Sequence, residues 1–426
     1  VSSNRAREWA WVDREIWTER MLTALENGVQ GGKWFSLIDK VYDLRTLHRA
    51  WADVRARGGA AGVDEQSCAR FAAQADRYLE ELSEALRAGR YRPAPVRRVD
   101  IPKAGGQRRP LGIPTVKDRI VQSAVKRVIE PIFEREFCSM SYGFRPGRGC
   151  KDALRAVDAL LKDGYTWVVD ADLKSYFDTI PHQRLMASVE RRISDGRLLD
   201  LLWSWLKQDV VQEMEHWTPA GGTPQGAVIS PLLANIYLHD LDVQLVQQGY
   251  RMVRYCDDFV ILCRSAAQAH RALAEVSAWV EANGLVLHPD KTHVGNCLEE
   301  GQGFEFLGYR FEGGRRWVRR KSRQALRERV RAHTRRTCGQ SMSQVVEALN
   351  PILRGWFCYF QHAHRREFPA VDGFVRRRLR AILRKQTKRP GRGRCQEDHR
   401  LWPNAFFAEQ GLFTMAEASA WASQSR

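Results

Sequence analysis

The sequence lacks two features, and each absence excludes a class of protein. No stretch approaches the ~18 consecutive uncharged apolar residues that a membrane-spanning helix needs, so we expect no membrane association. None of the nine cysteines forms a Cys-x-x-Cys pair, which argues against a disulfide framework or a zinc site and favours reduced thiols in the cytoplasm. The 426 residues are 44% hydrophobic, which is enough for two or three folded domains.

Acidic residues are scarce in one segment of the chain. Residues 311–400 hold 25 Lys and Arg but only 7 Asp and Glu, and this segment carries the whole net charge of +18. In the rest of the chain the two signs of charge balance. A basic segment joined to a neutral one is typical of a protein that holds a polyanion with one part and processes it with the other.

Two adjacent aspartates stand where two apolar runs meet. Residues 252–253 and 259–262 predict two short strands, with Asp257 and Asp258 at the turn between them. Asp is a poor strand former and two like charges repel each other, whereas a divalent cation between two carboxylates neutralises them. The alternative is a solvated turn, because Asp is common in turns.

A second acidic strand precedes this hairpin. Residues 167–169 predict a strand, and Asp172 follows where that strand would end. If the strands are neighbours in one sheet, Asp172 faces Asp257 and Asp258, and the three carboxylates could hold two Mg²⁺ ions about 3.5–4 Å apart. Strand alternation places Asp170 on the same face as Asp172, so spacing alone does not choose between them.

Both acidic motifs resemble those of reverse transcriptases. Residues 255–258 resemble the family's Tyr-x-Asp-Asp box, with Cys256 where Ala is usual, and residues 172–177 resemble its first catalytic motif. The resemblance implies an RNA-directed DNA polymerase in which three aspartates bind two Mg²⁺ ions and catalyse nucleotidyl transfer. These metal-binding and catalytic residues are Asp172, Asp257 and Asp258.

A basic hairpin is predicted upstream of both motifs. Residues 101–114 alternate around a Gly-Gly turn, and Lys103 and Arg109 could clamp a triphosphate from its two arms. The alternative is an exposed basic hairpin. The stretch is similar to the fingers hairpin of bacterial group II intron reverse transcriptases, and this similarity favours the clamp.

Three more nucleotide-binding residues follow from the resemblance alone. The Pro-Gln-Gly box at residues 224–226 matches that of the family, which implies that Gln225 contacts the incoming nucleotide. Phe177 corresponds to the aromatic gate against a 2′-hydroxyl, and Lys291 resembles the lysine near the nucleotide phosphates.

Basic residues predict the RNA contacts. In the Gly-rich stretch 141–150, Arg145 and Arg148 could follow a template backbone, although an ordinary loop explains the pattern equally well. Arginines every fourth residue after position 320 form one stripe on a helix, and like charges in such a stripe repel unless phosphates meet them. Residues 350–360, which contain a Leu-Arg-Gly-Trp run, and residues 376–385 predict two further basic helices, and that run resembles a maturase domain. The expected RNA-binding residues of this segment are Arg323, Arg327, Arg331, Arg335, Arg354, Arg376 and Arg377.

The expected fold class is α+β. It is a right-hand polymerase, with fingers and a palm built on an antiparallel sheet, followed by an α-helical thumb or maturase domain. Helical periodicity predicts one amphipathic helix over residues 37–51, and residues 304–309 predict one strand that resembles the family's primer-gripping strand. The expected domains are an N-terminal helical extension (1–60), fingers and palm (61–310), a basic helical thumb or maturase domain (311–400) and a short tail (401–426).

The resemblance implies a bacterial group II intron reverse transcriptase and maturase. Such a protein binds intron RNA, assists its splicing and copies it into cDNA during retrotransposition. Cys395 and His399 alone cannot form the Cys- and His-rich nuclease domain of some members, so we expect a member without that domain. The expected partners are intron RNA, an RNA template with a DNA primer, dNTPs and target DNA.

Oligomeric state and biological role stay open at this point. We expect a monomer or homodimer in the cytoplasm of a bacterium, associated with the nucleoid. One alternative function is a free-standing reverse transcriptase that has been domesticated for repair or defence. The other is an RNA-binding splicing cofactor with a vestigial polymerase.

Overall fold

The computed structural model describes residues 9–29, 31–102, 108–213, 215–337, 339–389 and 395–424. The chain folds as two compact units that divide after Val294, and the short stretch Thr166–Val168 belongs to the second. No helix within these ranges is long and apolar enough to cross a membrane.

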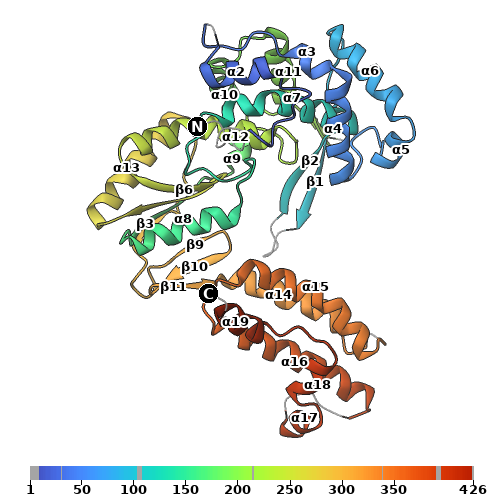
Figure 1. The fold of residues 1–426 in the computed structure, drawn as a ribbon, viewed down its shortest axis with the longest axis vertical. Helices are drawn as coiled ribbons and strands as arrows, with labels where there is room; N and C mark the ends of the chain where they lie inside the picture. The colour runs from blue at the N-terminus through green and yellow to red at the C-terminus, as the bar shows by residue number, and fades with distance from the viewer. Residues whose placement is uncertain are drawn as a thin grey trace. The chain divides into compact units, whose positions relative to one another are not determined.

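The first unit combines helices with the strands of two sheets (Figure 1). Its helices are α2 (Glu19–Asn27), α3 (Ile38–Tyr42), α4 (Leu44–Arg57), α5 (Cys68–Ala72), α6 (Ala75–Arg87), α7 (Val116–Glu134), α8 (Cys150–Lys162), α9 (Tyr176–Thr179), α10 (His182–Glu190), α11 (Gly196–Leu206), α12 (Ser230–Gln247) and α13 (Ala266–Ala282). Its strands are β1 (Val96–Pro102), β2 (Arg108–Ile113), β3 (Trp167–Asp172), β4 (Val210–Gln212), β5 (Glu215–Trp217), β6 (Arg251–Tyr255), β7 (Asp258–Cys263) and β8 (His293–Asn296), and the boundary between the units falls within β3 and β8.

The sheet that carries the acidic motifs has the strand order β6-β7-β3-β8. We call it the palm sheet. Its two inner strands, β7 and β3, contain the runs that the sequence predicts, and α8, α12 and α13 pack against the β6–β7 hairpin. Side chains 259–262 of β7 are all 0% exposed, which is expected of a central strand covered on both faces.

The other sheet of this unit has the order β2-β1-β4-β5. Strands β1 and β2 form the predicted antiparallel hairpin, in which Ile101 pairs with Arg109 and Pro102 with Arg108. The turn of this hairpin, with Lys103, lies outside the described residues.

The second unit joins a small antiparallel sheet to a group of helices (Figure 1). The sheet has the order β11-β10-β9, with β9 at Phe304–Phe306, β10 at Tyr309–Glu312 and β11 at Arg315–Val318. The helices are α14 (Arg320–His333), α15 (Met342–Phe360), α16 (Glu367–Gln386), α17 (Gln396–Leu401), α18 (Asn404–Glu409) and α19 (Met415–Gln424). The α+β fold class is confirmed.

Two elements that the sequence predicts as continuous are each interrupted in the structure, one by a helix cap and one by a tight turn. The helix predicted over residues 37–51 breaks into α3 and α4 because Asp43 caps α4, its carboxylate accepting from the backbone N–H of Arg45. The strand predicted over 304–309 is a hairpin instead. Leu307 and Gly308 have φ of +47° and +86°, which fits a two-residue turn between β9 and β10.

The helices of the basic segment differ from the prediction at two places. Arg335 lies beyond the end of α14, so the predicted stripe of four arginines keeps only three on that helix. Helix α15 starts eight residues before the predicted beginning at Asn350, because Ser341 and Gln344 form a capping box there. Pro351 is therefore inside the helix.

Candidate active site

The predicted hairpin is present, but its turn lies one residue earlier than expected, because Asp258 is the first residue of β7. Tyr255 pairs with Asp258, which leaves Cys256 and Asp257 as the two turn residues. We call these two residues the acidic turn. Cys256 has a φ of +63°, a conformation that glycine favours, so the turn is held in place at some cost. Burial raises the pKa of the Cys256 thiol, and Asp257 adds to the shift, so the thiol stays protonated at neutral pH.

A buried polar network holds the acidic turn from behind. Arg254 is 0% exposed and forms an ion pair with Asp242 of α12, which is also 0% exposed. The Arg254 guanidinium also donates to the carbonyl of Cys256 at 3.0 Å and to Oδ1 of Asn235 at 2.9 Å. Asn235 in turn donates to the carbonyl of Gly143 at 2.8 Å. Helix α12 thus fixes both the turn and the loop that packs on it.

Asp172 ends β3, the strand next to β7. In the segment that follows it, the Tyr176 hydroxyl is buried and donates to the carbonyl of Ala234 in α12 at 2.6 Å. Burial raises the pKa of Tyr176, and Cys256 and Asp257 add to the shift. Lys291 Nζ lies 2.6 Å from Oδ2 of Asp172. Asp170, which strand alternation could not separate from Asp172, lies near His293, at 4.0 Å.

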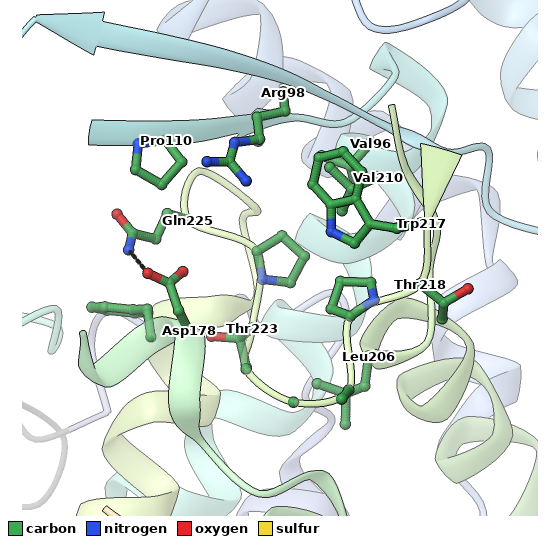
Figure 2. Close-up of a pocket in the computed structure, with 17 residues that line it drawn as sticks. Val96, Arg98, Pro110, Asp178, Leu206, Val210, Trp217, Thr218, Thr223 and Gln225 are labelled. Atoms are coloured by element: carbon green, nitrogen blue, oxygen red, sulfur yellow. Dashed lines mark hydrogen bonds between the residues drawn. The ribbon is translucent and has the colours of Figure 1, made fainter. Parts of the chain in front are cut away.

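The predicted nucleotide-binding residues Arg109 and Gln225 contact each other. Arg109 Nε donates to Oε1 of Gln225 at 2.8 Å, and Gln225 Nε2 donates to Oδ2 of Asp178 at 3.0 Å. Phe177 precedes Asp178 in the short helix α9. Figure 2 shows the Gln225 amide facing the Asp178 carboxylate at one side of a pocket of about 520 Å³, which Phe177 and Arg98 also line.

Glycines allow the 221–226 loop to lie this close to its neighbours. A Cβ on Gly222 would come within 2.7 Å of the carbonyl oxygen of Phe177, and one on Gly226 within 2.4 Å of the carbonyl oxygen of Gly112. Both glycines also have positive φ, of +88° and +109°. The Pro-Gln-Gly box therefore depends on glycine for backbone contact.

The 141–150 loop contradicts part of the sequence interpretation. The Arg145 side chain is 2% exposed, is paired with Glu134 and donates to the carbonyls of Cys138 and Ser141. The prediction that Arg145 contacts RNA is therefore wrong for this arrangement, because its guanidinium is fully used inside the protein. Arg148 is half-buried and donates to the carbonyl of Ser139 at 2.6 Å. The exposed side chain of this loop is Phe144, 50% exposed, with its ring 6.3 Å from that of Tyr255.

The predicted arginines of the second unit fall into two groups. Arg323 is paired with the buried Glu367, at 3.2 Å. Arg327, Arg331 and Arg377 instead surround the ring of Phe374, at 5.7, 5.7 and 5.4 Å from its centroid. None of these three forms an ion pair within the part of the chain that the structure describes. We call them the arginine cluster.

Three further predicted arginines lie elsewhere in the second unit. Arg354 is exposed and lies over the ring of Phe413 at 4.8 Å. Arg376 is half-buried, and its charge lowers the pKa of Asp372, which burial as the largest effect raises. Arg335 is exposed.

Sequence reasoning missed Asp178, Arg254 and Asn235 as parts of the site. Asp178 and Asn235 act through partners far away in the chain: the Asp178–Gln225 bond spans 47 residues and the Asn235–Gly143 bond spans 92. Arg254 pairs with Asp242, 12 residues earlier. For Asp178 a local signal existed, its position directly after Phe177 in the first acidic motif. For the other two the local sequence offers none.

Comparisons with known proteins agree with this geometry. Residues 101–311 match the family described as "Reverse transcriptase (RNA-dependent DNA polymerase)", and residues 323–402 match "Group II intron, maturase-specific domain". Protein YkfC of Escherichia coli (strain K12) is 37% identical over 301 residues, which cover 62% of this chain and 77% of YkfC. The group II intron-encoded protein LtrA of Lactococcus lactis subsp. cremoris is 39% identical over 170 residues, 40% of this chain and 28% of LtrA.

Similarity to solved structures is weaker. A chain of a partial Cas6-RT-Cas1–Cas2 complex is 27% identical and aligns over 58% of this chain and 43% of that chain, with a TM-score of 0.37. A TM-score this low supports no argument about function.

An acidic hairpin turn in a sheet that also carries a second acidic strand, within residues that match the reverse transcriptase family, defines a polymerase of the reverse transcriptase class. Within that class, the chain belongs to the group II intron reverse transcriptases with a maturase domain.

Proposed function

We propose that this enzyme copies group II intron RNA into DNA, and that it also binds the intron RNA and assists its splicing. The observation that carries the polymerase part is the order of the palm sheet. Asp172 ends β3 and Asp258 begins β7, the adjacent strand, with Asp257 at the turn before it. Such carboxylates at adjoining strand ends suit phosphoryl transfer.

Reverse transcriptases use divalent metal ions, and we propose that Asp172, Asp257 and Asp258 hold two Mg²⁺ ions here. The donor chemistry fits, because carboxylate oxygens are the ligands that hard cations prefer, and Asp172 already holds a cation, the Lys291 ammonium. Among the described residues no three metal-ligating side chains lie close enough together to form a group that could hold an ion. When bound, Mg²⁺ would neutralise triphosphate charge and ease deprotonation of the primer 3′-hydroxyl.

The remaining residues position the nucleotide. When Asp172 turns towards a cation, Lys291 is released from it and its ammonium can meet a phosphate oxygen. Arg109 and Gln225 present a hydrogen-bonded pair to the incoming nucleotide, and the ring of Phe177 stands against a 2′-hydroxyl. Lys103 completes the triphosphate clamp in this proposal.

The maturase part of the proposal is supported by the arginine cluster. Three guanidiniums without an acidic partner repel one another, and phosphates of an RNA backbone relieve that repulsion. The neighbouring Arg378 is affected in the same way, because burial first, and then the charges of Arg331 and Arg377, lower its pKa. RNA template, DNA primer and target DNA are the partners that this surface and the palm would share.

Primer extension on an RNA template with Mg²⁺ and dNTPs tests the polymerase. Asp257→Asn should lower the extension rate at least about a hundredfold, because it removes one of the carboxylates proposed to hold the Mg²⁺ ions that neutralise the triphosphate. Asp163→Asn is the matched control, because Asp163 forms an exposed pair with Arg264. An Asp257→Asn variant that extends primers at the wild-type rate would contradict the assignment.

Binding to the RNA that flanks the gene, measured in parallel, separates the candidate roles. Extension together with tight, specific binding supports an intron-encoded enzyme that also assists splicing. Extension without specific binding favours a domesticated polymerase. Specific binding without extension leaves a splicing cofactor and overturns the polymerase proposal.

A further inference from the structure

The side-chain amide of Gln225 is tied at both ends. Its oxygen accepts from Arg109 Nε at 2.8 Å and its nitrogen donates to Asp178 Oδ2 at 3.0 Å. A guanidinium can only donate and an ionised carboxylate can only accept, so these two partners allow a single orientation of the amide. Without Asp178, the amide nitrogen would have no fixed acceptor in this arrangement.

The charged groups around Asp178 favour its ionised form, and the surrounding protein opposes it. Asp178 keeps accessible surface because it faces the 520 Å³ pocket, which Leu206, Val96 and Val210 line with apolar atoms. Desolvation in this wall raises the pKa of Asp178, whereas the hydrogen bond from Gln225 and the charges of Arg98 and Arg109 lower it. The fold therefore keeps a carboxylate at a place that disfavours its charge, which is common where a side chain has a task.

The bond from Asp178 is not needed to hold the loop that carries Gln225. The backbone of that loop is fixed separately: Thr223 N–H donates to the carbonyl of Phe177 at 2.6 Å, and Gly222 N–H donates to that of Ile180 at 2.8 Å. On the other side, the carbonyl of Gln225 accepts from Gly112 N–H of β2 at 2.6 Å. Loss of the Asp178 carboxylate would therefore free the Gln225 side chain and leave the loop in place.

We propose that Asp178 is a positioning residue for nucleotide binding, which acts through Gln225. Its carboxylate orients the amide so that Gln225 and Arg109 form one fixed surface for an incoming dNTP. Through Gln225, the Asp178 carboxylate also links α9, which carries Phe177, to the β1–β2 hairpin, which carries Arg109. This role rests on the proposed function, since it requires that Gln225 contacts the nucleotide.

Steady-state primer extension with the full chain tests this role. Asp178→Asn keeps the shape of the side chain but presents a donor as well as an acceptor, so the Gln225 amide loses its single orientation. The KM for dNTP should rise about tenfold, the effect of losing one charge-assisted hydrogen bond, and kcat should fall less than about threefold. Asp163→Asn should leave both parameters unchanged, because Asp163 is an exposed residue paired with Arg264.

A double-mutant cycle with Gln225→Ala identifies the route of the effect. If Asp178 acts through Gln225, adding Asp178→Asn to Gln225→Ala raises KM by less than twofold further. Tenfold effects that multiply would overturn the role, because Asp178 would then act independently. An unchanged KM for Asp178→Asn alone would overturn it as well.

Two further outcomes separate the possible explanations. One distinguishes a structural role of Asp178 from a positioning role, and the other distinguishes failure of this inference from failure of the proposed function. A melting temperature of Asp178→Asn close to the wild-type value is expected, because the loop backbone is held separately; a large fall would show that Asp178 is structural and would overturn the positioning role. A wild-type chain that extends no primer would overturn the proposed function, and the inference with it. That failure shows in the wild-type reaction, whereas failure of the inference alone shows only in the variants.

Discussion

Glycine at position 143 sets how closely the 141–150 loop approaches the acidic turn. A Cβ at this position would lie 2.3 Å from the backbone nitrogen of Cys256 and 2.8 Å from the carbonyl carbon of Tyr255. Contacts this short do not occur, so any side chain here must displace backbone. The backbone that would move carries Asp257, which links this glycine to the geometry of the site.

Gly143→Ala should therefore lower primer extension strongly, by at least about tenfold, and destabilise the protein by about 1–3 kcal/mol. Gly149→Ala in the same loop is the control, because the nearest atom to a Cβ there is 3.9 Å away and the backbone is extended. Primer extension and thermal melting measure the two effects. Equal activity of the two variants would show that the loop does not position the turn.

Asp178 also gives the stability of the protein a pH dependence. Its pKa is raised above the usual 3.8, so the folded chain binds this proton more tightly than the unfolded chain. The stability that protonation contributes is fully present below the unfolded pKa and is lost as the pH rises through the folded pKa. Arg98 and Arg109, the cations that face it, reduce the shift without reversing it.

Asp178→Asn cannot ionise, so its stability relative to the wild type should increase as the pH rises through this window. Urea unfolding of both proteins at a series of pH values from about 3.5 to 7 measures the difference. The raised pKa would be contradicted if the difference in unfolding free energy between the two proteins stayed constant with rising pH, or if the wild type gained stability relative to Asp178→Asn.

At the scale of elements, the β6–β7 hairpin depends on α12. The Arg254–Asp242 pair is 0% exposed at both side chains. Burial has the largest single effect and lowers the pKa of Arg254, but Asp242, followed by Tyr176 and Cys256, raises it, and the net shift is upward. A buried pair adds little compared with apolar residues of the same size, but removing one partner leaves an uncompensated charge. The pair therefore fixes the hairpin in register with α12 more than it adds free energy.

Arg254→Met should lower the free energy of unfolding by about 3–5 kcal/mol, because Asp242 is then buried alone. Asp242→Leu added to that variant should recover much of the stability but not the activity, because the bond from Arg254 to the Cys256 carbonyl is still lost. Urea unfolding and primer extension separate the two effects. Recovery of both would mean that the pair has no role in placing the acidic turn.

Sequence patterns predicted an element well where a single local run of residues determines its structure. The apolar run of β7 is local and was predicted in place, and the acidic turn was predicted within one residue. Arg145 shows the limit: a Gly-rich basic loop resembles a phosphate site, but Glu134 and two carbonyls, which no local pattern reveals, take its guanidinium. The Arg109–Gln225 bond joins residues 116 positions apart, so only the fold brings them together.

At the scale of the whole molecule, residues 311–400 carry the net charge of +18, and the charges in the rest of the chain balance. The balanced segment contains the palm sheet, and the basic segment contains the arginine cluster. Since the cluster has no acidic partner among the described residues, its charge remains for a polyanion. Arginines that are already paired with an acidic side chain, such as Arg323, add to the net charge but have no charge left over for a polyanion.

Alanine at Arg327, Arg331 and Arg377 together should therefore weaken RNA binding and flatten its dependence on salt. Three phosphate contacts on single-stranded RNA at roughly 0.7 each predict a slope of log K against log salt that is smaller by about 2. Fluorescence anisotropy over a series of KCl concentrations measures this slope. Arg389→Ala is the control, because Arg389 already pairs with Glu397 at 2.9 Å and should leave the slope unchanged. An unchanged slope in the triple variant would place the RNA on another surface.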